Sequence, residues 1–322
     1  MSCPFRLRCL RASGPALVAL MSCAAPCGMQ PSALAQAPAG TVEPIVRVEY
    51  QEAAAQPGLA AEPAQVAARI VPEAGAPERF NLVQRPNEHP LMPALRVAQQ
   101  SLVDLDQGIR DYQAIMIKRE RIDGELMDEE VAFVKVRHQP FSVYMFFLKP
   151  AKGRECLYVA GPNGEEGKLF ARDSGFKRKF GIFEFSPHDR LPMKGQKYPI
   201  TKLGIRNLTS ELIDVASNDV NFGECEVRTL QTELGPANGE KRPVTLLEVT
   251  HPVPRKNFRF HKAQVFIDNE HGVPIRYAAY LWPENAGEQP PLEEEYTYLN
   301  LKINNGFTDL DFNKENPELF KD

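Results

Sequence analysis

The sequence predicts an α+β domain in which antiparallel strands make up most of the fold and two helices accompany them. An apolar stripe at helical spacing begins near residue 91. Strand-forming runs separated by turn dipeptides follow it, and a second helical stripe near residue 203 precedes a further series of strands. With 322 residues, the chain can bury a core without disulfides or metals.

The N-terminal segment 1–35 has the composition of a secretory signal peptide. It opens with a positively charged stretch that contains Arg6, Arg8 and Arg11. The apolar run Ala16 to Ala25 follows, and it is well short of the about 20 residues that span a bilayer. Ala33-Leu34-Ala35 then gives the small-x-small pattern that a signal peptidase recognises. We therefore expect an exported bacterial protein, periplasmic or associated with the cell envelope.

Two questions about cysteines stay open at this point. Leu20-Met21-Ser22-Cys23 resembles a lipobox, so acylation of Cys23 competes with cleavage before Gln36. After that cleavage only Cys156 and Cys225 would be left, and an oxidising compartment would permit a disulfide between them. The alternative is two separate buried thiols, since cysteine is among the most buried residue types.

Residues 36–88 are rich in Ala, Pro, Glu and Gln and carry few large apolar residues. Such a segment cannot recover the entropy that ordering would cost, so we expect a disordered linker before a folded domain at 89–322. Within it, Pro63 to Ile70 could form a short helix with Pro63 at its first position.

The folded domain is expected to start with an amphipathic helix at Met92 to Gln107, stopped by Gly108. Its apolar residues recur at mostly three- and four-residue steps, at Leu91, Leu95, Ala98, Leu102, Val103 and Leu105.

Residues 112–150 predict two long strands and a shorter third. Asp123-Gly124 is a hairpin-turn dipeptide, and Gln139-Pro140 ends the second strand. The third strand, Phe141 to Leu148, is apolar at nearly every position. Because side chains alternate between the faces of a strand, both of its faces need an apolar cover.

The rest of the chain predicts more strands around one helix. Glu155 to Ala160 and Lys168 to Arg172 read as strands, whereas 173–199 is irregular. The helix is expected at Ile200 to Ala216, capped by Thr201 or Asn207. Strands follow at about Glu224–Thr232, Pro243–Thr250, Lys262–Asp268, Pro274–Trp282 and Glu293–Ile303.

The order of these elements resembles the periplasmic lipoprotein-carrier superfamily of LolA and LolB type. The matching residues are Tyr112, Pro140, Tyr144, Pro150, Ile267-Asp268, Gly272-Val273-Pro274, Phe312 and Pro317. The resemblance covers residues 89–320. It implies a curved antiparallel sheet that forms an open half-barrel, with helices packed on a concave side that can hold lipid acyl chains.

The chain is similar, more closely, to an exported family named domain of unknown function 1571. Five segments carry this likeness: 118–121 (KRER), 124–126 (GEL), 135–137 (KVR), 140–145 (PFSVYM) and 153–155 (GRE). That family has no assigned activity, so the likeness implies a fold and a compartment and little chemistry.

An apolar groove is the first candidate site. We expect five side chains to line it, with the apolar strand as one wall: Met116, Tyr144, Phe146, Tyr277 and Trp282. The alternative is that all five are core residues packed by their neighbours, which is the commoner role of strand aromatics.

Basic residues form two further candidate sites. Arg119 and Arg121 on one strand, with Lys135 and Arg137 on the next, could hold an anionic head group if the strand register brings them together. The alternative is cross-strand salt bridges with Glu120, Glu125, Glu129 and Glu130. Lys177-Arg178-Lys179, beside three phenylalanines, could touch a membrane surface or an acidic polymer, or form a solvated loop.

No catalytic, metal or cofactor motif is present in the sequence, and a net charge of −4 argues against nucleic acid as a partner. We expect a non-enzymatic envelope protein that binds lipid or lipoprotein acyl chains, with peripheral membrane contact. One alternative is a structural or interaction protein with no ligand cavity. An enzyme with an unrecognised site is the third hypothesis. The sequence does not give the oligomeric state.

Overall fold

A computed structural model of the chain describes residues 48–50, 63–70, 80–285 and 287–321. The predicted signal peptide, Cys23 and most of the predicted linker lie outside these residues. All structural statements below concern the unit Pro44–Asp322. Among the described residues, no helix is both long and apolar enough to span a bilayer.

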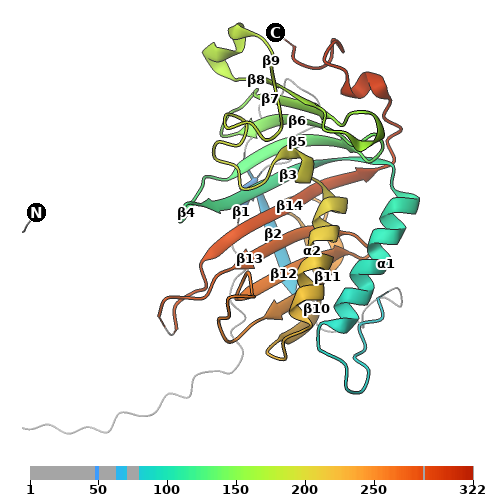
Figure 1. The fold of residues 1–322 in the computed structure, drawn as a ribbon, viewed down its shortest axis with the longest axis vertical. Helices are drawn as coiled ribbons and strands as arrows, with labels where there is room; N and C mark the ends of the chain where they lie inside the picture. Colours follow the sequence, from blue (N-terminus) through green and yellow to red (C-terminus); the bar gives the residue numbers. More distant parts are fainter. Residues whose placement is uncertain (1–47, 51–62, 71–79, 286, 322) are drawn as a thin grey trace, which may run out of the picture. The chain divides into compact units, whose positions relative to one another are not determined.

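In this part of the chain, fourteen strands form one antiparallel sheet (Figure 1). The order is β1-β2-β10-β11-β12-β13-β14-β3-β5-β6-β7-β8-β9, and β4 pairs with β3. The sheet is open, because β1 and β9 stand at its two ends. The strands are β1 Val48–Tyr50, β2 Pro63–Ile70, β3 Asp111–Ile122, β4 Glu125–Leu126, β5 Glu130–Arg137, β6 Ser142–Lys149, β7 Glu155–Val159, β8 Lys168–Arg172, β9 Phe183–Phe185, β10 Glu226–Pro236, β11 Arg242–Thr250, β12 Lys262–Asp268, β13 Pro274–Tyr280 and β14 Leu292–Ile303.

Two α-helices, α1 (Met92–Gly108) and α2 (Ile205–Asp219), pack against each other and lie across one face of the sheet (Figure 1). Short 3₁₀ helices occur at η1 (Pro162–Gly164), η2 (Gly175–Phe180), η3 (Ile200–Lys202) and η4 (Asp309–Phe312). The predicted α+β class, the first helix and the antiparallel strands are therefore confirmed.

The start of α2 differs from the prediction. The helix begins at Ile205, and its N-cap is Gly204 with no side-chain cap. The Asn207 amide instead donates to the carbonyls of Thr201 and Leu203 at 3.0 Å, which holds the preceding turn. The expected caps are wrong because Pro199 and the 3₁₀ turn η3 delay the α-helix by five residues.

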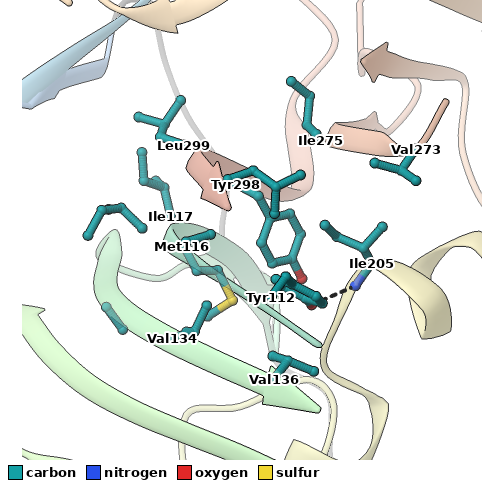
Figure 2. Packing of buried hydrophobic residues seen from close by; sticks show 14 of the residues in the cluster. Tyr112, Met116, Ile117, Val134, Val136, Ile205, Val273, Ile275, Tyr298 and Leu299 are labelled. Carbon is teal, nitrogen blue, oxygen red and sulfur yellow. Dashed lines mark hydrogen bonds between the residues drawn. The ribbon is translucent and has the colours of Figure 1, made fainter. Parts of the chain in front are cut away.

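Tyr112 explains where α2 starts. Its hydroxyl accepts a hydrogen bond from the backbone N–H of Ile205 at 2.9 Å, and this satisfies one of the unpaired N–H groups at the helix start (Figure 2). Gly204 has φ +112°, and a Cβ atom there would lie 3.0 Å from the Tyr112 hydroxyl. Glycine is therefore required by both backbone conformation and space.

The helix expected at Pro63–Ile70 is wrong, because this segment is strand β2, paired with β10. A helix of this length is marginal by itself, so an adjacent strand edge with free backbone groups outweighs local propensity. The core begins earlier than residue 89 as well, since Phe80 is buried.

Cys156 lies in β7 and Cys225 lies just before β10, and both are free thiols. Burial raises the pKa of each thiol to about 12, so both stay protonated near neutral pH. The structure thus agrees with the alternative of two separate thiols.

Candidate functional site

The main candidate site is a cavity of about 1360 Å³. One wall is the sheet face that carries Met116, Met145, Phe147 and Tyr277, here called the cavity face. The other wall is made by α2 and the continuous segment 191–200, here together called the cover. The cover contributes Leu191, Met193, Tyr198, Leu208, Leu212 and Val215.

Strand register places the cavity-face residues in several rows on one face of the sheet. Tyr277 pairs with Tyr296 and Tyr296 with Lys118, whereas Val134 pairs with Met145 and Met145 with Cys156. Directly paired residues point to the same face, so these positions all face the cover. Two of the five predicted groove residues, Met116 and Tyr277, lie on this face and line the cavity.

Tyr144 and Phe146 do not line the cavity, which corrects the prediction. They lie on the other face of β6, here called the closed face, and pack against Phe312, Leu319 and Phe320 of the C-terminal segment. The Tyr144 hydroxyl donates to the buried carboxylate of Glu155 at 2.7 Å. The prediction assigned the cavity to the wrong face of the strand. A strand that is apolar on both faces does not indicate which face lies against a cavity.

Trp282 also lies away from the cavity. Its indole N–H donates to the carbonyl of His251 at 3.1 Å, and its ring lies 5.8 Å from that of His261. The prediction fails here because β13 ends at Tyr280, so Trp282 follows the strand and leaves the alternation that places Tyr277 in the cavity.

The predicted anionic site is not assembled. Lys135 pairs with Gln113 and Arg137 with Asp111, so the register places them at the opposite end of β3 from Arg119 and Arg121. Each base has its own partner instead. Arg137 lies 2.7 Å from Asp309, Lys135 lies 3.2 Å from Asp311, and Arg121 donates to the carbonyls of Leu292 and Gly124.

Arg119 donates to the carbonyl of Met127 at 3.2 Å. The predicted alternative of cross-strand salt bridges holds for Lys118, which lies 2.9 Å from Glu130 on β5, and Arg121 lies 3.7 Å from Glu293 on β14. The acids that pair with Lys135 and Arg137 come from the C-terminal segment, far along the sequence, rather than from 120–130.

A polar cluster inside the cavity ties the cover to the sheet. Glu120 is 3% exposed and accepts hydrogen bonds from the Tyr296 hydroxyl at 2.5 Å and from the Lys197 backbone N–H at 3.0 Å. Lys118 lies 2.9 Å from Glu130 and donates to the Gln196 side chain. These contacts satisfy the buried charges and fix residues 196–197 over the cavity.

Lys197 itself bridges to two acids on β14. Its ammonium lies 2.6 Å from Glu293 and 2.8 Å from Glu294. Desolvation opposes its charge, but the Glu294 and Glu293 carboxylates outweigh that effect and raise the pKa of Lys197. Glu294 also accepts from the Tyr198 hydroxyl at 3.1 Å. We call Lys197, Glu293, Glu294 and Tyr198 the clasp.

The sequence predicts the helix of the cover but not its segment 191–200. The sequence predicts an irregular stretch at 173–199, and the signal for a covering segment there is the dense series of prolines and apolar residues between Pro187 and Ile200. Prolines restrict the unfolded chain, so ordering such a segment loses less conformational entropy. The segment can therefore bury apolar side chains without forming secondary structure.

One group of metal-ligating side chains occurs among the described residues, namely Asp268, Glu270 and His271. The guanidinium of Arg242 lies 2.9 Å from Asp268 and 2.6 Å from Glu270, and it also contacts His271 at 3.2 Å. A cation would have to displace this arginine, so the group reads as a charge-paired turn rather than a metal centre.

Comparison with known proteins gives one family match. The family model described as Protein of unknown function (DUF1571) matches residues 109–319. None of the curated proteins matches the chain.

Three solved structures have weak likeness to the chain. A domain named for outer membrane lipoprotein sorting from Vibrio parahaemolyticus has 15% identity and TM-score 0.34, over 70% of this chain and 97% of that one. A LolA superfamily protein from Nitrosomonas europaea has 14% identity and TM-score 0.28, over 67% and 97%. The Mycobacterium tuberculosis lipoprotein LppX has 14% and 0.33, over 66% and 98%. These TM-scores are low, so the likenesses define neither the fold nor a ligand.

Proposed function

The chain belongs to the DUF1571 family of proteins of unknown function, as its sequence predicted, and we propose that it is an exported, non-enzymatic protein of the cell envelope that binds lipid acyl chains. The ligand would lie in the cavity between the cavity face and the cover. In this proposal the open sheet acts as a half-barrel, and the two helices lie on its concave side.

The size and lining of the cavity carry the proposal. Its volume of about 1360 Å³ exceeds the about 300–1,000 Å³ of ordinary small-molecule pockets. Much of the lining is apolar, with Met116, Met145, Phe147, Leu169 and Leu208 among it. Each methylene transferred from water into such a site contributes about 0.8 kcal/mol, so a long acyl chain can bind without a specific polar contact.

The charges at the cavity are mostly committed to each other. Lys118 faces Glu120 and Glu130, and Arg259 pairs with Glu211. An anionic head group would have to compete with these acids, so affinity would come from the chain rather than the head. We therefore keep Met116 and Tyr277 as ligand-contacting residues and place Arg119, Arg121 and Arg137 outside the site.

The test is to fill the cavity from the sheet side. Ala171 in β8 lines the cavity, whereas its neighbour Phe170 packs on the closed face beneath Lys314. Ala171→Trp should weaken binding of a fluorescent fatty acid by about tenfold or more, since it removes space for several methylenes. Phe170→Trp serves as the matched control and should leave binding within about twofold.

Native mass spectrometry of gently purified protein adds an independent measurement. A co-purifying lipid that is absent from Ala171→Trp supports the proposal. If no lipid co-purifies and the wild type does not bind the fatty acid, the proposal fails, and the cavity belongs to a structural or interaction protein.

A further inference from the structure

An exposed apolar patch stands at the β9 edge of the sheet, at one end of the cavity. It consists of large side chains from η2, β9 and the start of the cover, with exposed fractions that are high for such residues: Phe176 73%, Phe180 61%, Ile182 40%, Phe183 48% and Leu191 66%. Single exposed apolar residues are ordinary, but a cluster of five usually marks an interaction surface.

Positive charge is interleaved with these rings. Lys179 lies over the Phe176 ring, with its ammonium 3.2 Å from the ring centre, and no described carboxylate pairs with it. Lys177 is 72% exposed and reaches Asp173 only at 3.7 Å. Aromatic rings next to lysines suit a lipid interface, where rings enter the head-group region and ammonium groups meet phosphates.

The 3₁₀ helix η2, which carries part of this patch, is anchored to the sheet by an arginine. Arg178, between the two lysines, points inward, where its guanidinium lies 3.0 Å from the Glu155 carboxylate and donates to the Gly153 carbonyl at 2.7 Å. Arg172 donates to the Arg178 carbonyl at 3.2 Å. With its central arginine anchored, η2 presents Phe176, Lys177, Lys179 and Phe180 outward at little further entropic cost.

The patch is continuous with the cavity. Lys177, Phe180, Phe183 and Leu191 contribute both to the exposed patch and to the lining of the cavity. A surface that touched a bilayer here would place lipid tails beside the cavity end, so a chain could pass between them without crossing water.

From this placement we propose that the patch formed by Phe176, Lys177, Lys179, Phe180, Ile182, Phe183 and Leu191 is a docking surface for an anionic lipid bilayer. The rings insert among the head groups and the two lysines pair with lipid phosphates. The surface itself does not depend on a ligand in the cavity; its role as an entry route rests on the function proposed above.

A second copy of the chain is the rival occupant, because among the described residues β9 pairs with β8 alone and its other edge is unpaired. The interleaved lysines favour the bilayer. Two copies meeting at this patch would bring Lys177 and Lys179 of each together, whereas anionic lipids would neutralise them.

The experiment is sedimentation of the full chain with vesicles of phosphatidylcholine alone and with added phosphatidylglycerol. Wild type should bind the anionic vesicles, and added salt should weaken binding. The double variant Phe176→Ser/Phe180→Ser should lose binding by tenfold or more, and each of Lys177→Ala and Lys179→Ala should lose about fivefold. Val83→Ser and Leu310→Ser, which alter side chains 74% and 59% exposed elsewhere, should bind as wild type.

Circular dichroism checks that every variant is folded, and light scattering reports mass without vesicles. Equal vesicle binding by wild type and the double phenylalanine variant would overturn the proposal, and so would a wild-type dimer that this variant dissociates. Fatty-acid binding in solution separates the two proposals. Vesicle binding without fatty-acid binding supports the docking surface and removes the ligand function, and the reverse result removes only the docking surface.

Discussion

The two faces of strand β6 carry similar apolar side chains but are packed differently. On the closed face, Tyr144 and Phe146 are covered by the C-terminal segment, and the Tyr144 hydroxyl donates to the buried carboxylate of Glu155. On the cavity face, Met145 and Phe147 look across a cavity of about 1360 Å³ toward α2 and residues 191–200. A strand that is apolar on both faces thus needs other segments to pack on each face. How tightly each face is packed depends on segments far along the chain.

The difference also lies in how each cover is attached. On the closed face, Glu155 accepts hydrogen bonds from the Phe320 backbone N–H at 2.6 Å and from Tyr144 at 2.7 Å, within an aromatic cluster. On the cavity face, residues 191–200 of the cover are held by ion pairs of the clasp and by the bond to Glu120. Removing a packed apolar side chain lowers the free energy of unfolding by several kcal/mol, roughly 2–5. A partly exposed ion pair contributes only about 1 kcal/mol or less to that free energy.

Adjacent truncations on β6 test this contrast most strongly. Tyr144→Ala should lower the free energy of unfolding by about 4 kcal/mol, because it opens a void in a packed cluster and removes a donor from Glu155. Met145→Ala should cost only about 2 kcal/mol, because it enlarges a space that already exists. Urea denaturation of both variants gives the comparison, and equal losses would contradict it.

A partly buried carboxyl group next to β5 should also give the protein a pH dependence. Glu129 precedes β5, and burial, with a smaller contribution from Glu295, raises its pKa to about 7 against the lowering effect of Lys149. A carboxyl whose pKa is raised by folding holds its proton better in the native state, so stability is complete below about pH 4.5 and falls as pH rises to about 7. The total loss is up to about 3 kcal/mol above that range.

Glu129→Gln should remove this loss. The variant should unfold at higher urea than wild type at about pH 8 and match it at about pH 4. Glu184→Gln, which changes a carboxylate that is 52% exposed, is the control and should leave the pH profile unchanged. A wild-type profile that is flat from about pH 4 to 8 would contradict the assignment.

Much of this fold was predictable, because its strands carry local signals. The Asp123-Gly124 turn, with φ of 51° and 85°, and the strand-forming runs of β3, β5 and β12 could be read from the residues alone. The site was less predictable. The strand pattern predicts Met116 and Tyr277 as groove residues, and both line the cavity. Which face of β6 lies against the cavity depends on the segments that pack on it. Residues 191–200 have no periodicity from which their position could be predicted.

A substitution at Gly204 tests the contact between the start of α2 and Tyr112 on β3. Gly204→Ala forces an L side chain into φ +112° and places its Cβ against the Tyr112 hydroxyl, so it should cost about 2 kcal/mol. Gly223→Ala is a matched control, because a Cβ at that glycine meets nothing within 4 Å and its φ is not positive. Thermal unfolding would measure both, and the two variants should separate by several degrees.

The smallest effect on stability should come from the clasp. Lys197→Met removes both contacts to Glu293 and Glu294, and because Lys197 is 25% exposed the stability change should be about 1 kcal/mol or less. Its kinetic effect should be larger. With the clasp open, residues 191–200 should leave the cavity more often, so a bound fluorescent fatty acid should dissociate several times faster at little change in stability. Lys321→Met, which removes a similar ion pair to Glu318 on the C-terminal segment, should leave that rate unchanged. Equal dissociation rates for wild type and Lys197→Met would mean that the cover of the cavity face is as fixed as the cover of the closed face.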